Sequence, residues 1–329
     1  MVSIKDVARQ AGVAISTVSK VLNNYPNISE ATRKRVNQAV EELNFVPNSV
    51  AAALSSKQAG RVALMIDLNV KTQAIDEVAM RYISGAITRA MELNLDVTTI
   101  FAFMFQDKTI EELIRYLQSQ SITGIIIYGA TEDDPALREM ILGGRFKCVI
   151  VDADQVGKST SSISINQTEA QYEVAKKMLE ESLGKKIPGK KILYISGDKN
   201  SYVTKSRLAG MEKLAEEMEL KLTVEYADFS EKSAREITGR QGRKADAIVC
   251  ASDLMAIGAK NMLREMNLDK PICGFDGISL MAYAGQGMYT VRQNFSEISA
   301  CAMEELHRLM NGREGRSVEA DYTVEKILF

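Results

Sequence analysis

Histidine occurs once in this chain of 329 residues, at His307, and the four cysteines lie far apart in the sequence. A single imidazole leaves little room for a histidine-based metal site or for a Ser-His-Asp triad. Cys148, Cys250, Cys273 and Cys301 include no Cys-x-x-Cys pair, which argues against a zinc ribbon or a redox motif. The sequence therefore predicts no metal site and four reduced, buried thiols.

Long apolar runs and nucleotide-binding motifs are missing as well. No run approaches the ~18 apolar residues that a transmembrane helix needs. The first residues, Met1 to Asp6, lack the basic, apolar and small-residue order of a signal peptide. There is no G-x-G-x-x-G after a strand and no G-x-x-x-x-G-K-[ST], so dinucleotide and NTP sites have no support. We expect a cytoplasmic protein without membrane contact and without a cofactor.

The chain has enough apolar residues for a large core, and its charge is uneven. It is 46% hydrophobic and 26% charged, and its length favours about two domains. Residues 1–60 carry seven Lys and Arg against four Asp and Glu, whereas the rest carries 34 against 39. A basic head of net +3 on a body of net −5 is typical of a DNA-facing module joined to a second part. A solvated basic face is the commoner cause of such a charge pattern.

Two short helices around a glycine are expected at the N-terminus. Ile4–Ala11 carries an apolar stripe behind Ser3 as N-cap, Gly12 ends it, and Ile15–Leu22 follows. This is the outline of a helix-turn-helix, whose second helix enters the major groove N-terminus first. A third helix, Glu30–Leu43, would close the core. The side chains expected to reach bases or phosphates are Ile15, Ser16, Thr17, Ser19, Lys20 and Asn23. The alternative is an ordinary α-hairpin with a polar outer face.

Three stretches of this region carry a family resemblance. They are I-K-D-V-A-x-x-A-G-V-x-x-x-T-V-S-K-V-L-N at 4–23, S-x-x-T-R at 29–33 and E-L-N-F-V-P-N-S-V-A-x-x-L at 42–54. They resemble the headpiece of the LacI/GalR family of bacterial transcription repressors, which implies a homodimer on operator DNA. Ala14 departs from the family, which usually has a helix-capping serine there. Losing such a cap costs roughly 0.5–2 kcal/mol of local stability.

The segment after Pro47 is a marginal helix by itself, and a flexible linker is the alternative. The resemblance implies a hinge helix that orders on DNA, with Leu54 wedged into the central base step of the operator. Ala52 stands where relatives often carry a polar or basic residue. The further DNA contacts that the resemblance implies are Ile4, Lys5, Asn27, Ser29, Thr32, Asn48, Ala51 and Leu54.

Beyond residue 60, short apolar runs alternate with amphipathic stretches, which predicts an α/β fold with covered parallel sheets, better split into two sheets than one. The strand-like runs are Val62 to Asp67, Val97 to Phe103, Gly124 to Tyr128, Cys148 to Asp152, Ile192 to Ser196, Ala247 to Ala251 and Ile272 to Phe275.

The body also resembles the periplasmic-binding-protein-like core of the same family. The matching motifs are S-R-L-A-G at 206–210, A-S-D-L-M-A-I-G-A at 251–259, G-F-D-G at 274–277 and T-V-R-Q-N-F at 290–295. In that doubly wound fold the chain crosses between two subdomains three times, here near Ile165, Gln293 and Asp321. The ligand then lies in the cleft, at the carboxyl ends of the strands.

Several residues fall at those strand ends and are expected to bind an effector. Asp152 and Asp276 would accept hydrogen bonds, which sugar hydroxyls donate well, and Arg207 occupies the arginine position of the family. Core packing is the alternative for each aromatic residue and is equally favoured for Phe295. Asp253 is expected to be the N-cap of the next helix. The predicted effector residues are Tyr128, Asp152, Arg207, Phe229, Ser252, Asp276 and Phe295.

These observations predict a helix-turn-helix domain at 1–46, a hinge at 47–58 and an effector-binding and dimerisation core at 59–329. Within the core, one subdomain would take about 59–165 and 292–320, and the other about 166–291 and 321–329. The function expected is a ligand-responsive regulator, most simply a repressor of carbohydrate-utilisation genes. The alternatives are a regulator whose effector is a phosphocarrier protein or a non-sugar molecule. A solute-binding protein would lack the headpiece, and an enzyme is disfavoured because no nucleophile–base pair stands out.

Overall fold

A computed structural model describes residues 3–22, 25, 28–43, 45, 60–66, 76–105, 108–132 and 134–328. The chain divides into two compact units, Met1–Ala59 and Gly60–Phe329, which are described separately below. None of the helices in the described ranges combines the length and apolar character that a bilayer crossing requires.

The first unit contains helices α1 (Ile4–Ala11), α2 (Ile15–Leu22) and α3 (Glu30–Glu42). At the start of α1, the Asp6 carboxylate accepts hydrogen bonds from the backbone N–H (3.0 Å) and the hydroxyl (2.6 Å) of Ser3. These bonds lower the pKa of Asp6 and fix the first turn. The helices share a small apolar core of Val7, Ala8, Ala11, Val18, Val21, Val36 and Ala39.

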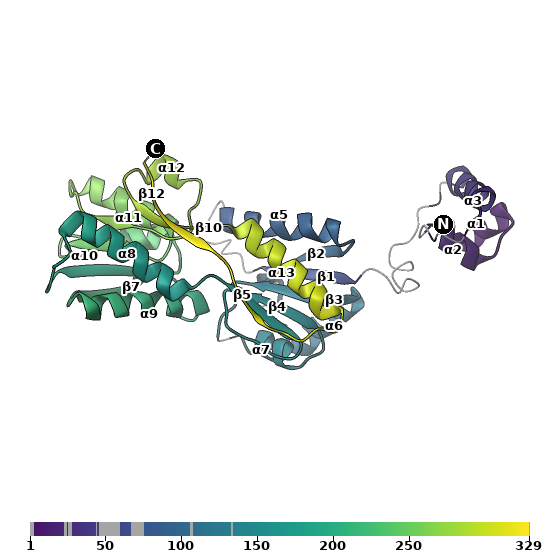
Figure 1. Ribbon diagram of the computed structural model, residues 1–329, viewed down its shortest axis with the longest axis horizontal. Coiled ribbons are helices and arrows are strands. Elements are labelled where there is room, and N and C mark those ends of the chain that lie inside the picture. Colours follow the sequence, from purple (N-terminus) through teal and green to yellow (C-terminus); the bar gives the residue numbers. More distant parts are fainter. Residues whose placement is uncertain are drawn as a thin grey trace. The chain divides into compact units, whose positions relative to one another are not determined.

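The second unit contains two sheets, each of six strands among the described residues (Figure 1). In the first sheet the order is β11-β5-β4-β3-β1-β2, and all neighbours are parallel. Its strands are β1 (Arg61–Ile66), β2 (Asp96–Phe101), β3 (Ile122–Tyr128), β4 (Lys147–Val151), β5 (Thr160–Ser164) and β11 (Ser317–Glu319).

The second sheet has the order β12-β10-β9-β8-β6-β7, with only the β10–β12 pair antiparallel among the described strands. Its strands are β6 (Lys191–Ser196), β7 (Lys221–Tyr226), β8 (Ala247–Cys250), β9 (Ile272–Cys273), β10 (Tyr289–Gln293) and β12 (Tyr322–Lys326). The predicted α/β fold with two mainly parallel sheets is therefore confirmed.

Helices cover both faces of the first sheet. Val62, Leu64 and Ile66 of β1 belong to the same core cluster as α5 (Glu77–Glu92) and α13 (Phe295–Met310), which lie side by side (Figure 1). The alternate residues of β1 pack on the other side with α6 (Ile110–Ser119) and α7 (Pro135–Leu142). The predicted strand from Val97 to Phe103 ends earlier, because residues 102–105 form a 3-10 turn.

Two pairs of helices, each packed side by side, accompany the second sheet. α8 (Gln167–Leu183) packs against α9 (Tyr202–Glu217), and α10 (Glu231–Gln241) packs against α11 (Asp253–Glu265). The first pair approaches so closely that a Cβ atom on Gly210 would lie 2.1 Å from the Thr168 carbonyl oxygen. A glycine is therefore required at the end of the S-R-L-A-G motif by backbone contact rather than by a ligand.

The chain passes between the two sheets after Ser164, after Gln293 and between Glu319 and Tyr322. A short helix, α12 (Met281–Ala284), follows β9. Of the cysteines, Cys148, Cys250 and Cys273 are buried, whereas Cys301 is half-buried; all four are free thiols. The prediction of four buried thiols is thus wrong for Cys301, which lies on α13 within 3.7 Å of a Glu297 carboxylate oxygen.

Candidate nucleic-acid interface and ligand cleft

The exposed face of α2 carries the side chains predicted to contact bases. Ile15, the first residue of α2, is 44% exposed although it is a large apolar residue. Ser16 and Lys20, one helical turn apart, are exposed too, whereas Val18 and Val21 are buried. The helix therefore buries one face in the three-helix core and presents apolar, hydroxyl and ammonium groups on the other, a combination that suits a major groove.

The remaining predicted contacts of the headpiece are placed unevenly. Thr17 and Ser19 are half-buried on α2, Ile4 is half-buried, and Lys5 is exposed. Asn23, Asn27, Asn48, Ala51 and Leu54 lie outside the described residues.

Ser29 and Thr32 are already engaged at the start of α3. The Ser29 hydroxyl oxygen accepts from the Thr32 backbone N–H at 3.4 Å, and the two hydroxyl oxygens are 2.9 Å apart. Ser29 is thus the N-cap of α3. At the start of α2, the Ala14 carbonyl accepts from Thr17 and Val18, while its methyl side chain offers no cap.

In the second unit, Asp152 directly follows β4 in a left-handed backbone conformation, with φ of 63°. Its carboxylate accepts hydrogen bonds from the Tyr82 hydroxyl (2.9 Å), the Ser164 hydroxyl (3.0 Å) and the Gln167 amide (2.9 Å). Burial, with the Asp152 charge, raises the pKa of Tyr82 well above its usual value, so the phenol stays protonated as a donor. These donors come from α5 and β5, which belong to the first sheet and its helices, and from α8, which accompanies the second sheet. Asp152 therefore forms hydrogen bonds with both halves of the second unit.

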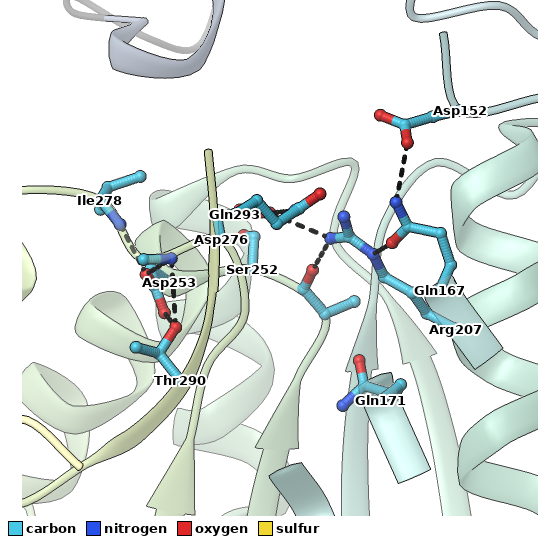
Figure 2. Close-up of polar contacts among 12 residues, drawn as sticks. Asp152, Gln167, Gln171, Arg207, Ser252, Asp253, Asp276, Ile278, Thr290 and Gln293 are labelled. Carbon is cyan, nitrogen blue, oxygen red and sulfur yellow. Dashed lines mark hydrogen bonds and ion pairs between the residues drawn. The ribbon is translucent and has the colours of Figure 1, made fainter. Parts of the chain in front are cut away.

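Arg207 on α9 is 4% exposed and lies at the carboxyl ends of β8 and β9, where the sequence predicts the ligand cleft. Figure 2 shows its guanidinium between Gln167 and Asp276, where Nε donates to Gln167 Oε1 at 2.8 Å. Nη1 donates to the Ala251 carbonyl at 2.5 Å and lies 3.3 Å from Asp276 Oδ1. The guanidinium also lies over the Phe275 ring, 3.8 Å from its centroid. Because Gln167 contacts both Arg207 and Asp152, the three charged residues form one hydrogen-bonded network.

Asp276 is the acidic partner of Arg207 in this network. It follows β9 with φ of 118°, and its Oδ1 also accepts from the Gln293 amide at 3.4 Å. Burial raises the pKa of Asp276 to about 7, with Arg207 opposing the shift and Asp152 adding to it. Its charge therefore changes near neutral pH, at the position where a ligand would donate a hydrogen bond.

The start of α11 differs from expectation in the role of Asp253. Ser252, not Asp253, is the N-cap of α11, and its hydroxyl accepts from the Met255 N–H at 3.3 Å. The N-cap assignment of Asp253 is wrong because the loop after Asp276 folds back over the helix start. The buried Asp253 carboxylate accepts there from the Gly277 N–H (2.8 Å), the Ile278 N–H (3.0 Å) and the Thr290 hydroxyl (2.7 Å), as Figure 2 shows.

The predicted aromatic residues fall in two environments. Tyr128 and Phe295 are buried around Tyr82, with ring centroids 4.7 Å and 5.2 Å from it, and the Tyr128 hydroxyl pairs with that of Ser299. Phe229 instead is half-buried beyond the carboxyl end of β7, with φ of 56°. Its ring covers Gly197, where a Cβ atom would lie 2.0 Å from the ring.

Three site residues escaped the sequence analysis: Tyr82, Gln167 and Gln293. Gln293 stands within the matched T-V-R-Q-N-F motif and Gln167 beside the first crossing, and those positions were the available signals. In the described part of the chain, Gln293 Oε1, Gln171 Nε2 and Thr204 Oγ1 are buried without a hydrogen-bond partner. Such atoms can bind a polar ligand or water without breaking an existing bond.

Comparisons with known proteins match both units of the chain. A model described as bacterial regulatory proteins, lacI family, matches residues 3–48. A periplasmic binding protein domain model matches residues 146–314.

Curated relatives match nearly the full length. The HTH-type transcriptional regulator RegA of Clostridium saccharobutylicum is 29% identical, covering 95% of this chain and 93% of RegA. Catabolite control protein A of Staphylococcus aureus is 25% identical, covering 94% of this chain and 93% of that protein.

Solved structures match in fold. The lac repressor dimer bound to operator and the anti-inducer ONPF superposes with a TM-score of 0.82 and 22% identity, over 100% of this chain and 99% of that chain. The complex of the transcriptional regulator CelR with cellobiose gives a TM-score of 0.69 and 22% identity, over 99% of this chain and 98% of that chain.

Proposed function

We propose that this chain, which belongs to the lacI family of bacterial regulatory proteins, represses carbohydrate-utilisation genes in response to a sugar bound in its cleft. It is a DNA-binding transcriptional regulator that joins a lacI-type headpiece to a periplasmic-binding-protein-like core. The observation that carries the sugar proposal is the network of Asp152, Gln167, Arg207 and Asp276. The cytoplasm, where operator DNA is found, is its expected location.

The chemistry of this network suits a neutral polyhydroxylated ligand. A hydroxyl group both donates and accepts, so it can donate to the Asp152 or Asp276 carboxylate and accept from the Arg207 guanidinium. Two carboxylates beside one guanidinium disfavour an anionic ligand. Phe229, half-buried at the same strand edge, offers an apolar surface for a sugar ring. The CelR complex, solved with cellobiose, supports the same class.

We infer that the cleft binds its ligand without converting it. The charged groups of the cleft hold one another in hydrogen bonds, and the family members that the chain matches are regulators. The cleft groups thus position a ligand between the two sheets, whose relative movement would change the presentation of the headpieces in a dimer. Whether the ligand releases or recruits the repressor depends on the state that it binds more tightly.

The dimer that we propose would use the outer face of α5. Met80, Ile87 and Met91 are 63%, 39% and 73% exposed and lie on one side of this helix. Tyr82, Ala86 and Ala90, on the other side, pack into the core. An exposed apolar stripe of this kind is typical of a protein contact. The operator-bound lac repressor, a dimer, has the same fold.

A second candidate effector is a phosphocarrier protein. The similarity to catabolite control protein A along nearly the whole chain favours it. A protein effector would dock outside the cleft, so operator binding would respond to it even after the cleft network is broken. A small-molecule effector would lose its influence when Arg207 is replaced.

A thermal-shift screen of sugars, nucleobases and sugar phosphates tests the proposal. A ligand that binds only the folded protein raises its melting temperature by mass action. We expect a neutral sugar to raise the melting temperature of the wild type and not that of Arg207→Met. Lys213→Met, which breaks the exposed ion pair with Glu169, is the matched control and should keep the full shift. A shift by nucleobases or sugar phosphates alone would contradict the sugar assignment.

A further inference from the structure

A separate cavity of ≈ 340 Å³ lies at the opposite end of the strands that carry the cleft. Pro271 and Ile272 line it at the start of β9, and Met288 and Tyr289 line it at the start of β10. Asp276 and Gln293, which belong to the cleft, follow or end the same two strands. Because parallel strands place their two ends on opposite edges of a sheet, this cavity is distinct from the effector cleft.

Three lysines line this cavity, and one of them is neutralised. Lys326 on β12 forms an ion pair with Glu181 on α8, and the Tyr289 hydroxyl donates to the same carboxylate. Lys326 also lies over the Tyr289 ring, 5.4 Å from its centroid. These contacts satisfy the Glu181 charge, so Glu181 is not available to neutralise the other two lysines.

Lys260 and Lys270 are held by backbone carbonyl groups instead. Lys260 Nζ donates to the Gln286 carbonyl at 2.7 Å. Lys270 Nζ donates to the Arg243 carbonyl at 3.2 Å and to the Ala245 carbonyl. Within the described ranges, neither ammonium forms an ion pair with a carboxylate. An ammonium has three N–H donors, so both lysines keep donors for a further acceptor.

Lys260 is half-buried beside charged groups of both signs. Burial and, less strongly, the nearby Arg264 lower the pKa of Lys260, whereas the exposed Asp269 carboxylate, which also lines the cavity, raises it. An anion in the cavity would stabilise the Lys260 ammonium, since a charged acceptor would replace the water that burial removes from it.

We propose that this cavity is a binding site for a small molecule with a phosphate group, contacted by Lys260 and Lys270. The volume of ≈ 340 Å³ fits the range of about 300–1,000 Å³ typical of small-molecule sites. A phosphate group offers three oxygens and up to two charges to separate ammonium groups, and lysine binds phosphate as a point charge. The site goes beyond the sugar-responsive function, because it does not share the cleft residues and does not depend on them.

Isothermal titration calorimetry of the full chain with inorganic pyrophosphate, at constant ionic strength, tests this site. We expect saturable binding of one pyrophosphate per chain, weakened about tenfold or more in Lys260→Met and in Lys270→Met, as for the loss of a charged hydrogen bond. Ser182→Phe should abolish binding while it keeps both lysines, because Ser182 lines the cavity. Lys221→Met, an exposed lysine at the start of β7, is the control and should bind as the wild type does.

Three results would overturn the proposed site. The first is the absence of saturable pyrophosphate binding to the wild type. Binding that survives in Lys260→Met and Ser182→Phe would place the pyrophosphate elsewhere, for example on the basic headpiece. Citrate binding as tightly as pyrophosphate would refute the phosphate class. Thermal unfolding of each variant, compared with Lys221→Met, separates loss of binding from loss of folding.

Discussion

The two units of the chain place their predicted functional side chains in opposite ways. In the described part of the headpiece, the buried residues are all apolar, and Ile15, Ser16 and Lys20 point to solvent. In the larger unit, Arg207 and Gln167 are buried and fixed by hydrogen bonds. A partner as large as a DNA duplex can be recognised by side chains on a solvent-exposed face of a helix. A small ligand requires polar groups held within a cleft, where each must be satisfied by another.

This difference has an energetic consequence. Surface substitutions away from special features change stability by about 0.5 kcal/mol or less, so a base-contacting residue can be replaced without loss of folding. Removing one partner of a buried charged pair leaves the other uncompensated. Substitutions on the exposed face of the headpiece should therefore change DNA binding without changing stability. Substitutions in the cleft network should change both ligand binding and stability. The following predictions test that contrast, beginning with the largest expected effect.

Removal of residues 1–59 should abolish specific operator binding and leave a folded, ligand-binding remainder. The second unit has its own core clusters, and none of them includes a headpiece residue. Gel-shift titration with an operator, alongside thermal unfolding with the cleft ligand, measures both halves of this prediction. Specific operator binding by the truncated chain would show that the assignment of DNA recognition to residues 1–59 is wrong.

Arg207→Met should lower the free energy of unfolding by about 3–5 kcal/mol, because Asp276, Gln167 and the Ala251 carbonyl lose their shared donor. Denaturant titration of the full chain gives this value. Lys213→Met, which breaks an exposed ion pair, should leave the free energy of unfolding close to that of the wild type. Equal costs for the two variants would mean that the buried network does not behave as a coupled unit.

Ile15→Ala and Ser16→Ala should change which operator half-site is preferred, each lost base contact costing about 1–3 kcal/mol of binding free energy. Stability should stay within about 0.5 kcal/mol of the wild type, since both side chains are exposed. Selection from a random oligonucleotide library identifies the preferred site. Lys34→Ala, exposed on α3, serves as the control with an unchanged preferred site; the same site in an Ile15/Ser16 double variant would refute the assignment.

The affinity for a cleft ligand that donates to Asp276 should rise as the pH rises from 6 to 8. The pKa of this carboxyl is about 7, so about a tenth is ionised at pH 6, and affinity there should be about tenfold below its plateau. Asp276→Asn has no charge to titrate and should flatten the profile. A pH-independent affinity in the wild type would show that the ligand does not contact the ionised carboxylate.

The sequence predicts the elements that depend on local signals better than those that depend on contacts between distant residues. The bounds of α1 and α2 are predicted to the residue, because Ser3, Gly12 and the apolar periodicity act locally. β5, with the sequence T-S-S-I-S, carries no apolar pattern and was not predicted. It pairs with β4 and with β11, and its buried Ser161 donates a hydrogen bond of 2.8 Å to Glu305, which is 144 positions away in the sequence. No local signal reports such a contact.

In the cleft, too, the residues whose roles depend on contacts between distant positions were not predicted. Asp152 and Asp276 were predicted because carboxylates at strand ends beside a cleft need hydrogen-bond donors, and Arg207 because it occupies the arginine position of the resembled family. Gln167 was not, because its role arises only when the fold brings it to Asp152, 15 positions away, and to Arg207, 40 positions away. Asp253 was given the wrong role because the loop at Gly277 and Ile278, which takes its carboxylate, is 24 and 25 positions away.

Ligand binding in the cleft and operator binding by the headpiece should be coupled, and a linkage measurement tests this coupling. Operator affinity is measured with and without a saturating cleft ligand, and ligand affinity with and without operator. We expect each partner to change the affinity of the other by the same factor, different from one, and Arg207→Met to abolish the effect. A ligand that binds the wild-type cleft and leaves operator affinity unchanged would contradict it.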